Sequence, residues 1–138
     1  MDCLFCKIGR KEVAAEIVYE DDVSCAFLDI NQAGPGHTVL IPKTHASNLL
    51  ELPEDKIGPL FGGVKTVLGK LKAAFGADGF TIGINHGLAG GQIIDHLHIH
   101  LIPRFSGDAG GSVQSIVNNP PKESLKEIAE KIKKAGSG

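Results

Sequence analysis

The sequence of 138 residues has few aromatic side chains and little net charge. It contains six Phe, one Tyr and no Trp, and its formal net charge is −2. A platform that stacks nucleic-acid bases needs exposed aromatic rings, and a surface that binds a phosphate backbone needs excess positive charge. The composition therefore gives no reason to expect nucleic-acid binding, and the length suits one domain.

Long apolar runs and a disulfide framework are also missing. Residues 1–6 lack the basic start and the apolar stretch of a secretory signal, and the apolar runs elsewhere are too short to span a membrane. There are only three cysteines, and two of them, Cys3 and Cys6, lie close together, which makes a poor disulfide framework. We therefore expect a reducing, cytoplasmic setting and no membrane partner.

Short apolar runs between turn residues predict five strands. They cover residues 17–20, 23–28, 37–42, 80–84 and 97–102. Apolar side chains at steps of three and four predict a helix over 54–75, with a kink or a later start because of Pro59. A short amphipathic helix is predicted near the C-terminus, where Ser124 and Glu127 have the spacing of a capping box. The fold class predicted is α+β, with a mainly antiparallel five-stranded sheet, one long helix and a short C-terminal helix.

Three histidines form a row near the last predicted strand. His96, His98 and His100 alternate with apolar residues. In a strand, alternate side chains share one face at a spacing of roughly 6.5–7 Å, so one face would carry three imidazoles and the other would join the core. Packing alone does not require three polar rings on one face, so the row indicates a catalytic or metal-binding role.

Two kinds of chemistry fit this row. A His-x-His pair on a strand can hold a catalytic metal, which would make His98 and His100 ligands in a metal-dependent hydrolase. The same pair can present one imidazole as a nucleophile while its neighbour donates a proton. Gly90 and Gly91 lie just upstream, and glycines let backbone N–H groups approach a phosphate.

The remaining cysteines and histidines carry weaker signals. Cys3-x-x-Cys6 has the spacing of a zinc half-site, although a redox pair or two core thiols would also fit. Cys25 lies in a predicted strand and is expected to be a buried, small apolar residue. His37 and His86 have no evident partners in the sequence, so we predict solvent-facing loop positions for both.

The spacing of several motifs resembles one known family. Asn85, Gly87, Gly91 and Gln92 precede the histidine row, and Pro35-Gly36-His37 and Pro42-Lys43-x-His45 lie further upstream. This order resembles the histidine triad (HIT) superfamily, and most of all the Hint-type nucleotide-binding hydrolases. The resemblance implies a single HIT-like domain over residues 1–138, with a core of about 3–105 and an extension of 106–138. It also implies a purine nucleotide substrate and a homodimer with the long helix and the neighbouring strand at its interface.

The resemblance implies specific roles for the pocket residues. His98 would attack the α-phosphate of a nucleoside phosphoramidate or dinucleoside polyphosphate and form a nucleotidyl-histidine, while His100 would contact the phosphate and assist the leaving group. Phosphoryl oxygens would be stabilised by Gln92 and by the backbone of Gly91 and Ile93. Asn85 would position the substrate, and Asp29 and Ile30 would bind the ribose. Without the resemblance, Asp29 is equally well interpreted as a turn residue.

Two further expectations follow from the resemblance. His45 and His96 would join Cys3 and Cys6 around a structural zinc ion, which would leave His98 free to attack, and no organic cofactor is expected. Many relatives have Ser or Thr at the position of Ile93, so this chain lacks one hydroxyl donor there. The alternative function is therefore a nucleotide-binding regulatory or interaction module with little turnover.

Overall fold

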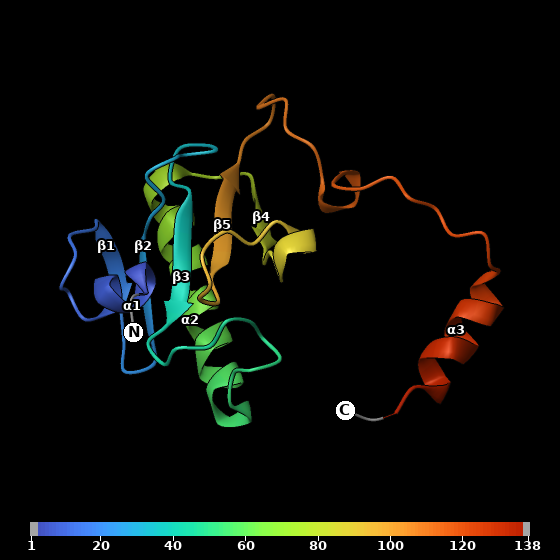
Figure 1. Cartoon of the computed structure of the whole chain (residues 1–138). Coiled ribbons are helices and arrows are strands. Elements are labelled where there is room, and N and C mark those ends of the chain that lie inside the picture. Colours follow the sequence, from blue (N-terminus) through green and yellow to red (C-terminus); the bar gives the residue numbers. More distant parts are fainter. Residues whose placement is uncertain (1–2, 137–138) are drawn as a thin grey trace.

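A five-stranded antiparallel sheet forms the centre of the molecule (Figure 1). The computed structural model describes residues 3–136, so the ends of the predicted domain, residues 1–2 and 137–138, lie outside it. The strands lie in the order β1 (Ile17–Glu20), β2 (Ser24–Leu28), β3 (Thr38–Pro42), β5 (Ile99–Arg104) and β4 (Gly79–Gly83). The predicted α+β fold and its five strands are confirmed, and the largest shift is in the last strand, which begins two residues later than predicted.

The last strand of the sequence lies inside the sheet. Leu40 of β3 is opposite Ile99, and Val39 is opposite His100. On its other side, β5 pairs along its length with β4, so that His100 is also opposite Gly83. The histidine row therefore enters the sheet between two strands, where the backbone is held from both sides.

The long helix α2 (Glu54–Phe75) packs on one face of the sheet. Its buried side chains form one core with apolar residues of the strands and the histidine segment: Leu60, Val64, Val67, Leu71, Ala26, Leu40, Leu97, Ile99 and Leu101. The helix runs unbroken from Glu54 through Pro59, so a start after Pro59 is wrong. Pro59 has no N–H to donate to the carbonyl of Asp55, one turn earlier. Both residues are exposed, so water can bind that carbonyl instead.

A short helix that the sequence did not predict packs on the opposite face. This helix, α1 (Leu4–Gly9), buries Phe5 and Ile8 against a second cluster of apolar side chains: Cys25, Phe27, Val39 and Ile41. Cys3 caps the helix, because its Sγ accepts the N–H of Cys6 at 3.4 Å. A helix of six residues is not stable alone, so the cap and the packing against the sheet hold it.

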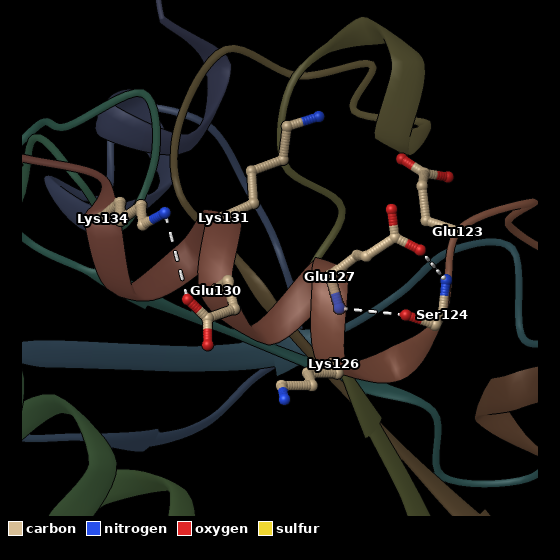
Figure 2. Close-up of a pocket in the computed structure, with 7 residues that line it drawn as sticks. All are labelled: Glu123, Ser124, Lys126, Glu127, Glu130, Lys131 and Lys134. Atoms are coloured by element: carbon tan, nitrogen blue, oxygen red, sulfur yellow. Dashed lines mark hydrogen bonds and ion pairs between the residues drawn. The ribbon is translucent and has the colours of Figure 1, made fainter.

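The C-terminal arm, residues 105–136, leaves the body of the molecule and ends in α3 (Leu125–Lys134) (Figure 1). The guanidinium of Arg104 anchors its start by donating to both carboxylate oxygens of Asp108. Figure 2 shows the predicted capping box at the start of α3, where the Ser124 hydroxyl and the Glu127 carboxylate each accept the other residue's N–H. The hollow along this helix is lined by side chains of both charges, as on an ordinary solvated face. None of the helices within residues 3–136 is long and apolar enough to cross a membrane.

Candidate functional site

The histidine row crosses from a loop into β5. His96 and His98 precede the strand and His100 lies in it, while Leu97, Ile99 and Leu101 point into the core beneath α2. The alternation of apolar and polar side chains predicted from the sequence is thus present. The rings of His98 and His100 are 5.1 Å apart between centroids, so the two imidazoles can act on one bound group.

The hydrogen bonding of His98 leaves one ring nitrogen available. Its Nδ1 lies 2.7 Å from the carbonyl oxygen of His96. A carbonyl can only accept, so Nδ1 carries the hydrogen and Nε2 keeps its lone pair. The edge of the Phe5 ring packs against this imidazole, with the ring centroids 5.1 Å apart, and the residue is only 6% exposed. The His98 ring is therefore held in place, with the lone pair of Nε2 not used by this hydrogen bond.

His37 is buried beside the row, and the prediction of a solvent-facing loop residue is wrong. Its Nε2 lies 2.9 Å from Nδ1 of His100, and its Nδ1 accepts the backbone N–H of Ala33 at 3.1 Å. The carboxylate of Asp29 is 3.5 Å from the same Nε2. Burial lowers the pKa of both His37 and His100, so both rings are uncharged near pH 7. His86 is exposed, as predicted.

Asp29 and Ile30 follow β2 at the mouth of this region. The Oδ1 atom of Asp29 accepts the N–H of Asn31 at 2.8 Å, which is the turn contact that the alternative interpretation expects. Its other oxygen faces His37. Ile30 is 95% exposed, so its side chain has surface free for a ligand.

A glycine-rich loop connects β4 to the histidine row. It contains the short helix η1 (Leu88–Gly90) and turns at Gly91, whose φ of 93° suits glycine. Asn85 lies beside Gly91, since a Cβ built on that glycine would be 3.6 Å from the Asn85 Cγ. The backbone N–H of Gly91 donates to Leu88, whereas that of Ile93 has no hydrogen-bond partner within residues 3–136. The Ile93 side chain is 91% exposed, so this N–H lies at an open part of the loop.

The Gln92 side chain closes this loop onto the rest of the protein. Its two amide hydrogens are donated to the carbonyls of Ser47, at 2.7 Å, and Ile94, at 3.0 Å. Its Oε1 accepts the N–H of Gly87 at 2.9 Å. With both donors engaged, the Gln92 side chain holds the loop in shape, and contact with a phosphate would require one of these bonds to break.

Four donor atoms converge on one point next to His96. The predicted ligands Cys3, Cys6, His45 and His96 all place their donor atoms within 4.8 Å of one another. The Sγ of Cys6 is 3.2 Å from Nδ1 of His45 and 3.4 Å from Nδ1 of His96. Zinc bonds of about 2.0–2.3 Å in a tetrahedral site place the donors roughly 3.3–3.8 Å apart, so this group is close to the spacing that zinc requires.

The ring orientation of His96 also suits a metal ligand. Its Nε2 lies 2.9 Å from the carbonyl oxygen of Pro42, so Nε2 carries the hydrogen and the lone pair of Nδ1 points toward the thiols. Burial lowers the pKa of His96 and keeps this ring neutral. Burial also raises the pKa of the Cys6 thiol, and the nearby Cys3 adds to this effect, so a cation is what would hold Cys6 as a thiolate. Within residues 3–136, a second group whose donor atoms lie close enough to hold an ion consists of Asp29, His37 and His100, and His98 belongs to neither group.

Comparison with known proteins identifies one family. A family model described as the HIT domain matches residues 10–107. An uncharacterized HIT-like protein of Methanocaldococcus jannaschii is 43% identical over 91% of this chain and 98% of its own length. An adenylylsulfatase of Arabidopsis thaliana is 38% identical over 83% of this chain and 58% of its own length. An adenosine 5'-monophosphoramidase of Schizosaccharomyces pombe is 32% identical, with 96% of each chain covered.

Solved structures give the same result. A HIT family member from Bacillus subtilis superposes with a TM-score of 0.85 over the whole of both chains, at 34% identity. A zinc-bound histidine triad protein from Mycobacterium smegmatis superposes with a TM-score of 0.76 over 88% of this chain and 86% of its own, at 32% identity.

Proposed function

The chain belongs to the HIT family, and from this premise we propose that it is a nucleotide hydrolase that works through a covalent nucleotidyl-histidine on His98. The observation that carries the proposal is the bond from His98 Nδ1 to the His96 carbonyl, which leaves Nε2 as a fixed lone pair. Relatives named as an adenylylsulfatase and an adenosine 5'-monophosphoramidase support a nucleotide with a phosphorus–oxygen or phosphorus–nitrogen bond as the substrate class.

The reaction has two steps. Nε2 of His98 attacks the α-phosphorus of a nucleoside phosphoramidate or a dinucleoside polyphosphate, and the bond to the leaving group breaks. Water then attacks the phosphorus, breaks the bond to His98 and releases the nucleoside monophosphate. Splitting one displacement into two is the advantage of covalent catalysis, and a buried imidazole held by a backbone carbonyl is well suited to it.

The pocket residues have complementary roles in this proposal. His100 contacts the phosphate and assists the leaving group. The N–H of Ile93, which has no hydrogen-bond partner among residues 3–136, and the backbone at Gly91 stabilise the phosphoryl oxygens. Gln92 supports the loop that carries them. Asn85 positions the substrate, and Asp29 and the exposed Ile30 bind the ribose of a purine nucleotide.

Cys3, Cys6, His45 and His96 would hold a structural zinc ion. The convergence of two thiols and two imidazole nitrogens supports this, as does the zinc-bound relative from Mycobacterium smegmatis. A site closed by four protein ligands gives the ion a structural role, which is to join α1 to the segments that follow β3 and precede β5.

We also propose a homodimer that buries α2 and β4. The strand β4 is at the edge of the sheet, and Phe61, Phe75 and Ile82 are partly exposed on these two elements, at 39%, 45% and 41%. Gly62 and Gly69 of α2 have open space where a side chain would be, which allows a second helix to come close. Sedimentation velocity would show one species of twice the chain mass.

One experiment tests the covalent mechanism. Purified protein is mixed with an adenosine 5'-phosphoramidate, quenched rapidly, digested and examined for a nucleotidylated peptide that contains residue 98. Unchanged hydrolysis by a His98→Ala variant would refute the mechanism. Tight nucleotide binding without turnover of any candidate would favour the alternative, a regulatory or interaction module. Activity that returns only when a divalent metal is added back after chelation would favour the metal-dependent hydrolase.

A further inference from the structure

A hollow of about 440 Å³ lies beside the histidine row, on the face of the sheet that α2 does not cover. Ile102 of β5 and Thr81 of β4 form its floor, and its walls are residues 33–35 and the start of the C-terminal arm, residues 105–116. Ile102 comes two residues after His100 in β5, so the two side chains share a face, and Thr81 is directly opposite Ile102. We call this the sheet hollow, and its volume is in the range of roughly 300–1,000 Å³ that small-molecule sites have.

The sheet hollow lies on the side to which the leaving group of the proposed reaction departs. An in-line displacement places the leaving group on the far side of phosphorus from the attacking atom. From His98, the polar face of the row continues through His100 to Ile102. The ribose residues Asp29 and Ile30 follow β2, whereas the floor of the hollow extends to β4, on the other side of β5. The nucleoside and the leaving group would therefore extend in opposite directions from the phosphate.

Apolar side chains line both the floor and the walls of the sheet hollow. They include Ala33, Pro35, Ile102, Pro103, Val113 and Ile116. On the wall made by the arm, Val113 is 55% exposed and Ile116 is 79% exposed, so both offer apolar surface that the chain itself does not cover. Such surface favours an apolar ligand, because their contact removes both from water.

The charged groups of the sheet hollow neutralise each other. Among the residues that line it, all within the described part of the chain, Arg104 and Asp108 are the charged ones. The guanidinium donates to both carboxylate oxygens of Asp108, at 2.8 and 2.9 Å, and also to the Thr81 hydroxyl and the Gly111 carbonyl. The bonds from Arg104, together with two backbone N–H groups, hold the pKa of Asp108 well below its usual range, so this carboxylate stays ionised. A sulfate or phosphate leaving group would therefore find no free cation among these lining residues.

We propose that the sheet hollow binds the leaving group, and that the substrates are nucleoside phosphoramidates of amines that carry an apolar alkyl or aryl group. This rests on the proposed function, in which His98 forms the nucleotidyl intermediate. Over the two steps the phosphorus–nitrogen bond breaks and its electron pair stays on nitrogen. One water molecule is consumed: its hydroxyl stays on phosphorus and its other hydrogen goes to the amine. Atoms and charge balance without another reactant.

The length of the amine tests the proposal. The wild-type protein is assayed with the adenosine 5'-phosphoramidates of methylamine and n-butylamine, whose basicities are nearly equal, so that the comparison measures contact with the protein. We expect kcat/KM to be about tenfold higher for the butylamide, because its extra methylenes are partly buried in the hollow. The amide of 4-aminobutyrate, which ends in a carboxylate, should lose this advantage, because Arg104 is already paired with Asp108.

Two variants remove apolar surface from different sides of the sheet hollow. Ile116→Ser changes the wall and Ile102→Thr changes the floor, and each should lower the butyl-to-methyl ratio of kcat/KM to about three or less. Ile116 is exposed, so its replacement does not disturb the core. Ile132→Ser replaces another exposed isoleucine, on α3 and outside the hollow, and is the matched control that should keep the wild-type ratio.

A ratio near one in the wild-type protein, or a wild-type ratio in both hollow variants, would overturn the proposal. So would a higher kcat/KM for adenylyl sulfate or a diadenosine polyphosphate than for the butylamide. Mass spectrometry of the peptide that contains residue 98 distinguishes these results from a failure of the proposed function. A nucleotidylated peptide formed from both amides would leave the proposed function standing, whereas its absence with both would overturn the two proposals together.

Discussion

Two groups of histidines lie on either side of His98, and their ring nitrogens are arranged in opposite ways. In the zinc cluster (Cys3, Cys6, His45 and His96) the lone pairs converge on one point. In the histidine relay (His37 and His100) donor and acceptor follow each other in a line. One backbone group sets each arrangement: the Pro42 carbonyl turns the lone pair of His96 toward the thiols, and the Ala33 N–H turns the donor of His37 toward His100. Identical side chains thus acquire different chemistry from a single backbone contact.

The sharpest test of this comparison is to replace His98, the residue that lies between the two groups. His98→Asn should lower the hydrolysis rate by about 10⁴-fold or more, because the attacking lone pair is lost. Single-turnover kinetics and mass spectrometry of the residue 98 peptide would measure this. Zinc content and the melting temperature should stay close to wild type. A variant that keeps more than about a tenth of the rate would show that the nucleophile lies elsewhere.

Loss of a zinc ligand should affect stability more than chemistry. Cys6→Ser leaves three ligands, and a metal present at about 100 times its Kd contributes roughly 2.7 kcal/mol, so the melting temperature should fall by about 10 °C. Metal analysis should show zinc near one per chain in wild type and little in the variant. Cys25→Ser is the matched cysteine control for zinc content, because Cys25 lies outside the cluster.

The two histidine groups would not have separate roles if the Cys6→Ser variant lost hydrolytic activity while it was still folded. At a temperature where the variant is folded, its rate on an adenosine phosphoramidate should stay within about tenfold of wild type, since no reacting group is removed. A rate loss comparable to that of His98→Asn would mean that the ion takes part in the chemistry.

The relay should make folding sensitive to acid. Burial lowers the pKa of His37 and His100 in the folded protein, while the unfolded chain has a histidine pKa of about 6.5. As the pH falls below about 6.5, the unfolded chain binds protons that the folded protein does not, so the free energy of unfolding decreases. Above that pH both states are uncharged at these rings and the penalty is absent.

Urea unfolding at pH 7.5 and pH 5.5 would measure this effect. His37→Phe removes one of the titrating rings, so the difference in unfolding free energy between the two pH values should be smaller than in wild type. His86→Phe replaces an exposed histidine outside the relay and is the matched control, so it should show the wild-type difference. The same difference in all three proteins would show that the relay is not the source of the acid sensitivity.

The smallest effect is expected in the C-terminal arm. Ser124→Ala removes the cap of α3 and should destabilise that helix by about 1 kcal/mol, which hydrogen exchange of the α3 amides would detect. Zinc content and the hydrolysis rate should not change, because α3 lies away from the sheet and from α1 (Figure 1). A change in zinc content or in the hydrolysis rate would show that the C-terminal arm influences the histidine groups. Their properties could then not be explained without the arm.

The sequence was informative wherever the signal is local. Apolar alternation and turn residues predicted all five strands, because each strand is built from neighbouring residues. The Ser124–Glu127 spacing predicted a capping box that is present. The helix α1 was missed, because six residues carry too little periodicity and its stability comes from a sheet face formed by residues 25–41.

Contacts between side chains that are far apart in the sequence were harder to predict. The convergence of Cys3, Cys6, His45 and His96 was expected only through the family resemblance, since spacing alone left the cysteine pair open to a redox or a core role. His37 was misplaced because its partner is 63 residues away and no local pattern joins them. Two signals for a buried position were available: His37 begins the apolar segment predicted as the strand 37–42, and Pro35-Gly36-His37 is one of the motifs that carry the family resemblance.

The insertion of β5 between β3 and β4 has a consequence for synthesis of the chain on the ribosome. Until residues 99–104 have emerged, β3 and β4 each have an open edge, and the three-stranded β1-β2-β3 unit has no partner on that side. His96, His98 and His100 arrive with the strand that fills the gap. A truncated nascent chain would therefore be both inactive and prone to pair with other chains, which makes it a natural client for chaperones.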